Sequence, residues 1–258
     1  MEITKAQFKI IEHLLPIQRG NVKIPNIQVI NAVLYVAEHG CKWRGLPEHF
    51  GYWHAIYMRV NRWAKKGVLD HVFSVLQSAD VINIQVDQVS LDSTIIKVHP
   101  DGTGAPKKNG QQAIGKSRGG WTTKIHMVAA DDKTAVAFSL SPGQSGDAPE
   151  GRDLLRTMEG CGWEGASVIM DKAYEGDDTR QLILDLGMMP VVPPKINRVT
   201  PWEYDKEMYK KRNEVERLFR RLKGFRRIFS RFDKLDVVFR FFINFSLIAD
   251  RLISVNRP

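Results

Sequence analysis

The hydrophobic periodicity of this chain changes near residue 85, and that change limits the folds the chain can adopt. Up to residue 80, apolar residues recur at spacings of three and four, a pattern that predicts amphipathic helices. From residue 86 to residue 98 the pattern alternates and is rich in β-branched side chains, which predicts a strand. We therefore expect a small all-α domain at residues 1–80 and a second domain at residues 85–258.

The second domain shows a recognisable order of elements. Three strands are expected first, and helices and strands then alternate. In chain order the expected elements are strands 86–98, 121–130 and 134–140, helix 148–159, strand 166–170, helix 177–186, strand 189–193 and helix 205–223. A last apolar helix is expected at residues 234–255. The order β-β-β-α-β-α-β-α predicts a ribonuclease-H-like α/β fold with a mixed sheet.

Positive charge is concentrated in one segment of the chain. The formal net charge is +9, and residues 206–231 contain eleven Lys and Arg against three Glu. A solvated helix face is one reading of such a run. A single dominant sign on an amphipathic pattern favours a polyanion surface, for which DNA is the obvious partner. Arg220 and Arg227 are candidate DNA contacts within this segment.

The first domain is expected to contain three short helices joined by tight turns, at residues 27–39, 51–65 and 68–77. Such a module resembles a helix-turn-helix unit. Arg59 and Arg62 lie three residues apart on the second helix and could face phosphates. A helical cap that covers the larger domain without binding DNA fits the same pattern.

Two aspartates lie where neighbouring strands of the expected sheet would bring them together. Asp92 is in the middle of the first strand, and Asp171 ends the fourth. In this fold order those two strands are neighbours at the centre of the sheet. Converging carboxylates can hold two divalent ions, which activate one oxygen and stabilise another during phosphodiester cleavage. A third carboxylate would have to come from a helix beside the sheet.

Glu216 meets that requirement. Four residues spaced by three, four and seven positions share one helix face: Tyr209, Arg212, Glu216 and Lys223. On that face a carboxylate suited to metal stands between two cations suited to phosphate. Glu214 is an alternative third carboxylate, but it lies about 200° round the helix from Glu216.

These residues carry a family resemblance. The pattern Tyr209-x2-Arg212-x3-Glu216-x6-Lys223 resembles the Y-x2-R-x3-E-x6-K signature of IS4/IS5-type bacterial insertion-sequence transposases. The segments LDST around Asp92, KSRGGWTTKIHMVAAD at residues 116–131 and MDKAYEGD around Asp171 are also similar to that superfamily, closest to its IS5 group. The resemblance covers nearly the whole chain.

The resemblance implies a DDE transposase that uses two Mg²⁺ or Mn²⁺ ions held by Asp92, Asp171 and Glu216. It further implies that Arg212 and Lys223 contact phosphates at the transposon end, and that Tyr209 orients Glu216 or the DNA. The partners would be double-stranded DNA, as terminal inverted repeats and as target, and further copies of the chain in a dimer or larger assembly.

Two other functions fit the same residues in part. One is a structure-specific nuclease on the same scaffold, which would use the metal site but leaves the Tyr-Arg-Glu-Lys face unexplained. The other is a non-catalytic DNA-binding regulator derived from a transposase. The presence of all three acids argues against a lost active site.

The sequence does not predict a membrane-spanning or secreted protein. No apolar run approaches the ~20 residues that span a bilayer, and the N-terminal segment lacks the apolar core of a signal peptide. We expect a cytoplasmic protein that associates with the nucleoid and not with membranes. Cys41 and Cys161 lack zinc-binding spacing and are expected to be core residues.

Overall fold

The computed structural model describes residues 1–83 and 87–254, and the chain forms two compact units. The first unit consists of Met1–Asp80, Val98–Gln112 and the chain from Leu222 onward. The second unit consists of Val81–Lys97 and Ala113–Arg221. None of the helices in the described residues is long and apolar enough to cross a membrane.

The first unit is built from helices. In chain order these are α1 (Lys5–Glu12), α2 (Asn26–His39), α3 (Trp53–Lys65), most of α4 (Val68–Asn83), α9 (Arg226–Phe229) and α10 (Asp236–Ser254). The three helices expected here are present, and α4 continues beyond its expected end. Helix α2 ends at Gly40, whose φ of 63° is the left-handed conformation that favours glycine. Helix α1 was not expected, although its N-cap Thr4 and Gln7 form a capping box.

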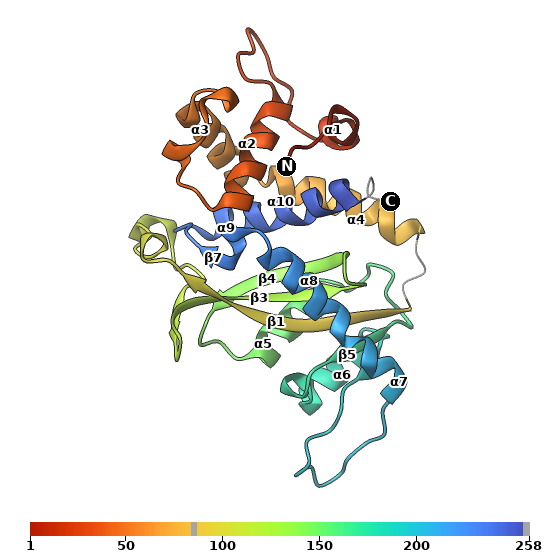
Figure 1. Cartoon of the computed structure of the whole chain (residues 1–258). Helices are drawn as coiled ribbons and strands as arrows, with labels where there is room; N and C mark the ends of the chain where they lie inside the picture. Colours follow the sequence, from red (N-terminus) through yellow and green to blue (C-terminus); the bar gives the residue numbers. More distant parts are fainter. Residues whose placement is uncertain (84–86, 255–258) are drawn as a thin grey trace. The chain divides into compact units, whose positions relative to one another are not determined.

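The core of the first unit is centred on α10. This helix contacts α2 and α3 (Figure 1). Four of its aromatic residues are buried: Phe239, Phe241, Phe242 and Phe245. Just before α10, the short strand β7 (Ser230–Arg231) accepts a hydrogen bond at Arg231 O from the His99 N–H. The buried Arg231 guanidinium pairs with Asp236 at 2.6 Å.

The second unit is centred on a mixed sheet. Its strands are β1 (Gln88–Val98), β2 (Gly115–Ser117), β3 (Gly120–Ala129), β4 (Ala135–Pro142), β5 (Ser167–Met170) and β6 (Met189–Val191). The order is β2-β3-β1-β5-β6, with β4 also paired to β3. Strand β1 is antiparallel to β3 and parallel to β5, which confirms the expected neighbours. The expected start of the first strand at Val86 lies outside the described residues.

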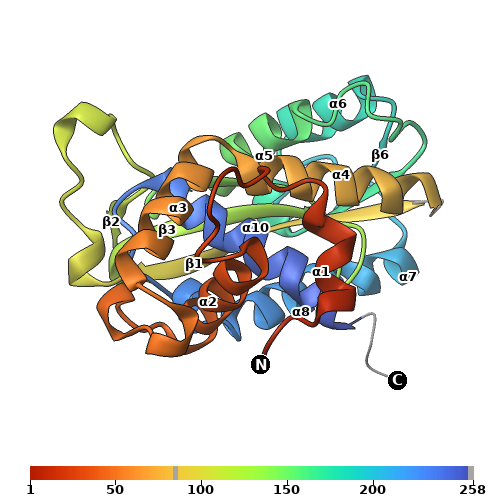
Figure 2. The same cartoon turned by 90° about the horizontal axis from the view of Figure 1, so that it is seen from above.

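Helices cover both faces of this sheet. Figures 1 and 2 show α5 (Asp147–Arg156) and α6 (Asp177–Asp185) on one face and α8 (Asn213–Lys223) on the other. One continuous helix was expected at residues 205–223. Instead, α7 (Lys206–Tyr209), a 3-10 turn (Lys210–Arg212) and α8 follow one another. With the helical segment ahead of the sheet, the element order confirms the predicted ribonuclease-H-like α/β fold.

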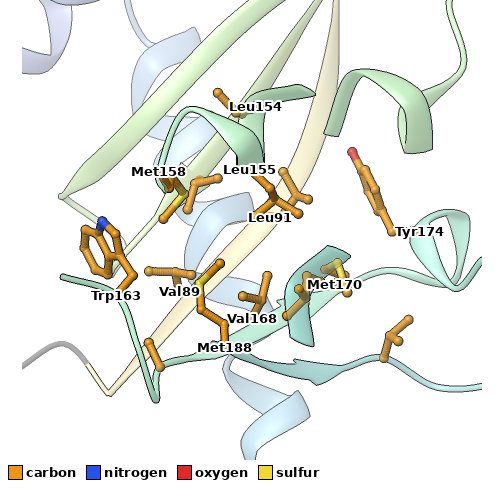
Figure 3. Packing of buried hydrophobic residues seen from close by; sticks show 14 residues of the cluster. Val89, Leu91, Leu154, Leu155, Met158, Trp163, Val168, Met170, Tyr174 and Met188 are labelled. Carbon is orange, nitrogen blue, oxygen red and sulfur yellow. The ribbon is translucent and has the colours of Figure 1, made fainter. Parts of the chain in front are cut away.

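A buried apolar cluster holds α5 against the sheet (Figure 3). It joins Leu91 of β1 and Leu155 of α5 to Tyr174, which is 1% exposed. Gly151 permits this close packing, because a Cβ there would lie 2.6 Å from Tyr174 Cε1. Since side chains alternate along a strand, Leu91 and Ser93 face α5 while Asp92 faces α8.

Candidate active site

The strand register brings Asp92 and Asp171 together. In the parallel pair β1–β5, Leu91 lies opposite Met170, and each aspartate is the next residue along its own strand. Beyond Met170 the chain leaves the sheet, and Asp171 starts a 3-10 turn that runs from Lys172 to Tyr174. The meeting of two aspartates across neighbouring strands therefore follows from the sheet order that the sequence predicted.

Arg212 connects this pair of aspartates to Glu216. Its Nη1 lies 2.7 Å from Glu216 Oε1 and 3.6 Å from Asp92 Oδ2. The Asp92 side chain is 17% exposed, and that of Glu216 is 44% exposed. The guanidinium thus lies between a largely buried carboxylate of the sheet and an accessible carboxylate of α8.

The carboxylates influence one another electrostatically. Burial is the largest cause that raises the pKa of Asp92, to about 6. The negative charges of Asp171 and Glu216 raise this pKa further, while the Ser93 N–H and the Arg212 guanidinium lower it. Asp92, Asp171 and Glu216 therefore form one interacting acidic group.

Glu214 belongs to a different acidic neighbourhood. Its pKa is raised first by burial and then by the charge of Asp131, with a smaller contribution from Asp132. Those two aspartates lie in the turn that joins β3 to β4. Of the two glutamates at the start of α8, only Glu216 interacts with Asp92.

Tyr209 lines the same acidic group. The Arg212 guanidinium carbon lies 5.9 Å from the centre of the Tyr209 ring, and Tyr204 packs edge-on against that ring at 5.6 Å. Burial raises the pKa of the Tyr209 phenol, and the charge of Asp171 raises it further. Three of the four signature residues thus converge with both aspartates in the second unit.

The donor set suits a hard divalent cation, because all three candidate ligands are carboxylates. In the described parts of the chain, no three His, Cys, Asp or Glu side chains are arranged to hold a metal ion as they stand. A positive group, the Arg212 guanidinium, lies between Asp92 and Glu216 instead. The carboxylates therefore already accommodate positive charge, and they fit Mg²⁺ or Mn²⁺ if Glu216 turns from Arg212 toward Asp92.

The remaining residues of the basic segment differ in their environments. Arg220 is exposed on α8. Lys223 ends α8 and is grouped with the first unit, where it lines an open pocket of about 570 Å³ with Arg226 and Phe229. Burial lowers the pKa of the Lys223 amine.

Arg227 is a buried structural residue in this structure. It is 6% exposed, and its Nη2 and Nε donate to the two carboxylate oxygens of Asp233 at 2.7 and 3.1 Å. The prediction that it contacts DNA does not agree with this burial. The charge count for residues 206–231 missed Asp233, because that acid lies two residues beyond the segment.

Two family models match successive parts of the chain. A family model described as "Transposase DDE domain" matches residues 87–249, which is more than half of the chain. The chain belongs to the DDE transposase family. A second model, described as "Putative transposase of IS4/5 family", matches residues 3–73 of the transposase. The predicted family and enzyme class are thereby confirmed.

Two curated proteins resemble parts of the transposase. A protein of Brucella ovis named "Putative transposase for insertion sequence element IS6501" is 32% identical over 125 residues, which are 48% of this chain and 92% of that protein. An uncharacterised protein of Sinorhizobium fredii, y4sN, is 37% identical over 82 residues, which are 31% of this chain and 62% of that protein.

Solved transposase structures show a distant likeness. The Mos1 transposase paired-end complex with left transposon end is 13% identical with a TM-score of 0.29, over 83% of this chain and 79% of that chain. The piggyBac transposase synaptic complex with hairpin DNA is 10% identical with a TM-score of 0.35, over 76% and 48% of the two chains.

Sequence reasoning missed the polar groups behind Asp92. Lys124, Ser93 and Asp147 form a connected set on the α5 face of the sheet. A lysine within the apolar strand at residues 121–130 was the available signal, because a buried ammonium needs a partner. The expectation of core cysteines was wrong for Cys161, which is exposed, and Cys41 is only half-buried.

Proposed function

We propose that this DDE transposase binds the terminal inverted repeats of an insertion sequence, cleaves the ends by two-metal hydrolysis and transfers the 3′-hydroxyl strand into target DNA. The observation that carries the proposal is the convergence of Asp92, Asp171 and Glu216, with Arg212 between Asp92 and Glu216. The Tyr209 phenol borders the same group.

Asp92, Asp171 and Glu216 are the proposed ligands of two Mg²⁺ or Mn²⁺ ions. When bound there, such ions would activate the attacking oxygen and stabilise the leaving oxygen. Asp92 lies within β1 and Asp171 directly follows β5. The Glu216 side chain is accessible and forms an ion pair with Arg212. Glu216 is therefore the ligand whose side chain has to turn, and Arg212 the cation that has to leave it.

Arg212 then becomes available for phosphate. Its guanidinium already lies within reach of the carboxylates, so a phosphate held by it would be close to the proposed metal ligands. Tyr209 packs beside Arg212 and would orient that guanidinium or the DNA. Lys223 and the exposed Arg220 are further proposed phosphate contacts on α8.

A basic groove in the first unit is the second part of the proposed DNA surface. The pocket has a volume of about 890 Å³, and its lining includes five cations and no acid: Arg19, Lys23, Arg59, Arg62 and Lys66. Burial and then repulsion from Arg62 lower the pKa of Arg59, which shows how closely these charges gather. A phosphate backbone would relieve that repulsion. We therefore assign DNA binding to residues 1–80 and catalysis to residues 85–258.

The proposed reaction also requires more than one copy of the chain. Two transposon ends have to be brought together, and each copy has one set of Asp92, Asp171 and Glu216. We propose a homodimer or a larger assembly on DNA, acting in the cytoplasm at the nucleoid.

The test is cleavage of a labelled duplex that carries the element's terminal repeat, with Mg²⁺ or Mn²⁺. We expect metal-dependent cutting at the repeat boundary, and at least a 100-fold loss of rate in Glu216→Gln because a metal ligand is removed. Glu214→Gln is the matched control on the same turn of α8 and should retain cleavage.

Other outcomes would change the assignment. Equal cutting by wild type and Glu216→Gln would remove Glu216 from the site. Cutting of branched DNA regardless of the repeat would favour a structure-specific nuclease. Specific binding of the repeat without cutting under either metal would favour a non-catalytic regulator.

A further inference from the structure

A buried lysine lies at the centre of the sheet on the face that α5 covers. Lys124 of β3 is 9% exposed, although an isolated ammonium is costly to bury. Its Nζ donates to Asp147 Oδ1 at 2.9 Å and to Ser145 O at 2.7 Å. Asp147 is the first residue of α5, so this ion pair fastens the start of α5 to the sheet.

Asp147 also holds Ser93 of β1. The Ser93 hydroxyl donates to the same Asp147 Oδ1 at 2.7 Å. Burial acts to raise the pKa of Asp147, but hydrogen bonds from Lys124 and Ser93, together with the charges of Lys124 and His126, outweigh it and the net shift is downward. Asp147 is therefore a charged carboxylate that accepts hydrogen bonds from Ser93 of β1 and Lys124 of β3, and it connects these two neighbouring strands.

Ser93 acts on Asp92 through its backbone. The Ser93 N–H donates to Asp92 Oδ1 at 2.7 Å. The parallel register between β1 and β5 ends at the pair Leu91–Met170, so the β5 ladder stops before Ser93 is reached. At the point where the ladder ends, the Asp92 carboxylate accepts the hydrogen bond from the Ser93 N–H.

Because successive side chains of a strand point to opposite faces, the hydrogen bonds of Ser93 link the two faces of the sheet. Asp92 faces α8 with Arg212 and Glu216, whereas Ser93 faces α5 with Asp147. One residue, Ser93, thus bonds the proposed ligand on one face by its N–H and is itself held on the other face by its hydroxyl.

We propose that Lys124, Asp147 and Ser93 are positioning residues that fix the orientation of the Asp92 carboxylate from the opposite face of the sheet. Groups behind metal ligands orient them, and their loss typically costs 10–100-fold in metal affinity or activity. The inference rests on the proposed function only in taking Asp92 as a ligand.

Tyr174 encloses the same network. This residue is 1% exposed, and its phenol interacts with Ser93 and with the charges of Asp147 and Asp92. Burial, reinforced by those charges, raises the pKa of the phenol far above its usual range. Tyr174 therefore stays a neutral phenol beside the Asp147–Ser93 contact.

The first experiment follows hydrogen exchange of the Ser93 amide in the full chain without metal. In Asp147→Asn we expect this amide to exchange at least tenfold faster. A neutral amide oxygen accepts more weakly from the Ser93 hydroxyl and no longer forms an ion pair with the Lys124 ammonium, so Ser93 is held less firmly for its bond to Asp92. Asp153→Asn is the matched control, since Asp153 lies on the same helix in an exposed pair with Arg156. An unchanged Ser93 exchange rate in Asp147→Asn would overturn the inference.

The second experiment measures Mn²⁺ affinity by electron paramagnetic resonance. Ser93→Ala and Asp147→Asn should each weaken Mn²⁺ binding about tenfold, and Ser93→Thr, which keeps the hydroxyl, should restore it. The double variant should lose no more Mn²⁺ affinity than either single variant, because both substitutions act on the same Ser93–Asp147 hydrogen bond. The control is Ser139→Ala on β4, whose hydroxyl has no hydrogen-bond partner within the described residues.

Asp92→Asn separates the two proposals. If it abolishes Mn²⁺ binding while Ser93→Ala and Asp147→Asn change neither Mn²⁺ affinity nor Ser93 exchange, the positioning network is wrong and the proposed site stands. If it leaves Mn²⁺ binding intact while Ser93 exchange still responds to Asp147→Asn, the network stands and the proposed metal site fails.

Discussion

At the scale of single residues, some buried polar groups lie outside the candidate active site and affect only the stability of the fold; His126 is one of them. His126 is fully buried on β3, and its Nε2 lies 2.8 Å from Ser141 Oγ. Burial is the main cause that lowers its pKa to about 4; the charge of Lys124 lowers it further, and that of Asp147 opposes the shift. His126 is therefore neutral in the folded protein at pH 7, and its contribution to stability depends on staying neutral.

We predict that the free energy of unfolding falls as the pH decreases from about 6.5 to about 4 because of His126. In that window the unfolded chain takes up a proton on this histidine and the folded chain does not, so a difference on the order of 3 kcal/mol is lost. Asp92 has a raised pKa and acts in the opposite direction. The measurement is therefore the difference between wild type and His126→Gln in urea unfolding across that pH range, and a constant difference would contradict the prediction.

The buried pair of Arg227 and Asp233 gives a second prediction at this scale. Asp233→Asn leaves a buried guanidinium without its charged partner, so we expect a loss of about 3–5 kcal/mol in stability. Urea or thermal unfolding provides the measurement. Asp153→Asn, which removes one exposed partner of a surface pair, should cost under about 1 kcal/mol. Equal effects of the two variants would show that Arg227 is not the buried structural cation described here.

At the scale of elements, the connection from β6 to α7 is held by one tryptophan. Trp202 donates its Nε1–H to Val192 O at 2.8 Å, and the guanidinium carbons of Arg180 and Arg198 lie 3.6 and 4.8 Å from its ring centre. Arg198 also pairs with the buried Glu175. Tyr209 lies at the end of α7, only seven positions after Trp202. The contacts of Trp202 therefore help to hold Tyr209 near the aspartates.

We predict that Trp202→Leu exposes this connection to proteases. Two cation–π contacts and one hydrogen bond together contribute ~1–2 kcal/mol, so trypsin cleavage after the exposed Lys195 should become about tenfold faster. Trp121→Leu, at a half-exposed tryptophan of β3, is the matched control and should leave that cleavage rate unchanged. An unaltered rate in Trp202→Leu would mean that other contacts hold the segment.

At the scale of the whole molecule, the sequence predicted what depends on local pattern. The order of strands placed Asp92 beside Asp171, and helix spacing selected Glu216 over Glu214. Pairings between residues far apart in the chain were not predictable, because no periodicity records them: Lys124 meets Asp147 across 23 positions. Asp233 lies only six positions from Arg227, but no spacing rule for helices links the two, and the acid lies outside the basic segment. The break in the 205–223 helix was missed for a related reason, since spacing alone does not distinguish an α-turn from a 3-10 turn.

The last prediction concerns the basic groove of the first unit and the salt dependence of DNA binding. Each cation that neutralises a phosphate releases a counterion, so Arg62→Gln and Lys66→Gln should each reduce the slope of log affinity against log salt by about 1. Lys9→Gln, an exposed cation of α1 outside the groove lining, controls for net charge and should leave the slope unchanged. The measurement is fluorescence anisotropy with a labelled duplex at several salt concentrations. If all three variants keep the wild-type slope of log affinity against log salt, the groove is not a phosphate-binding surface. The basic residues of α8 would then be the remaining candidates for DNA contact.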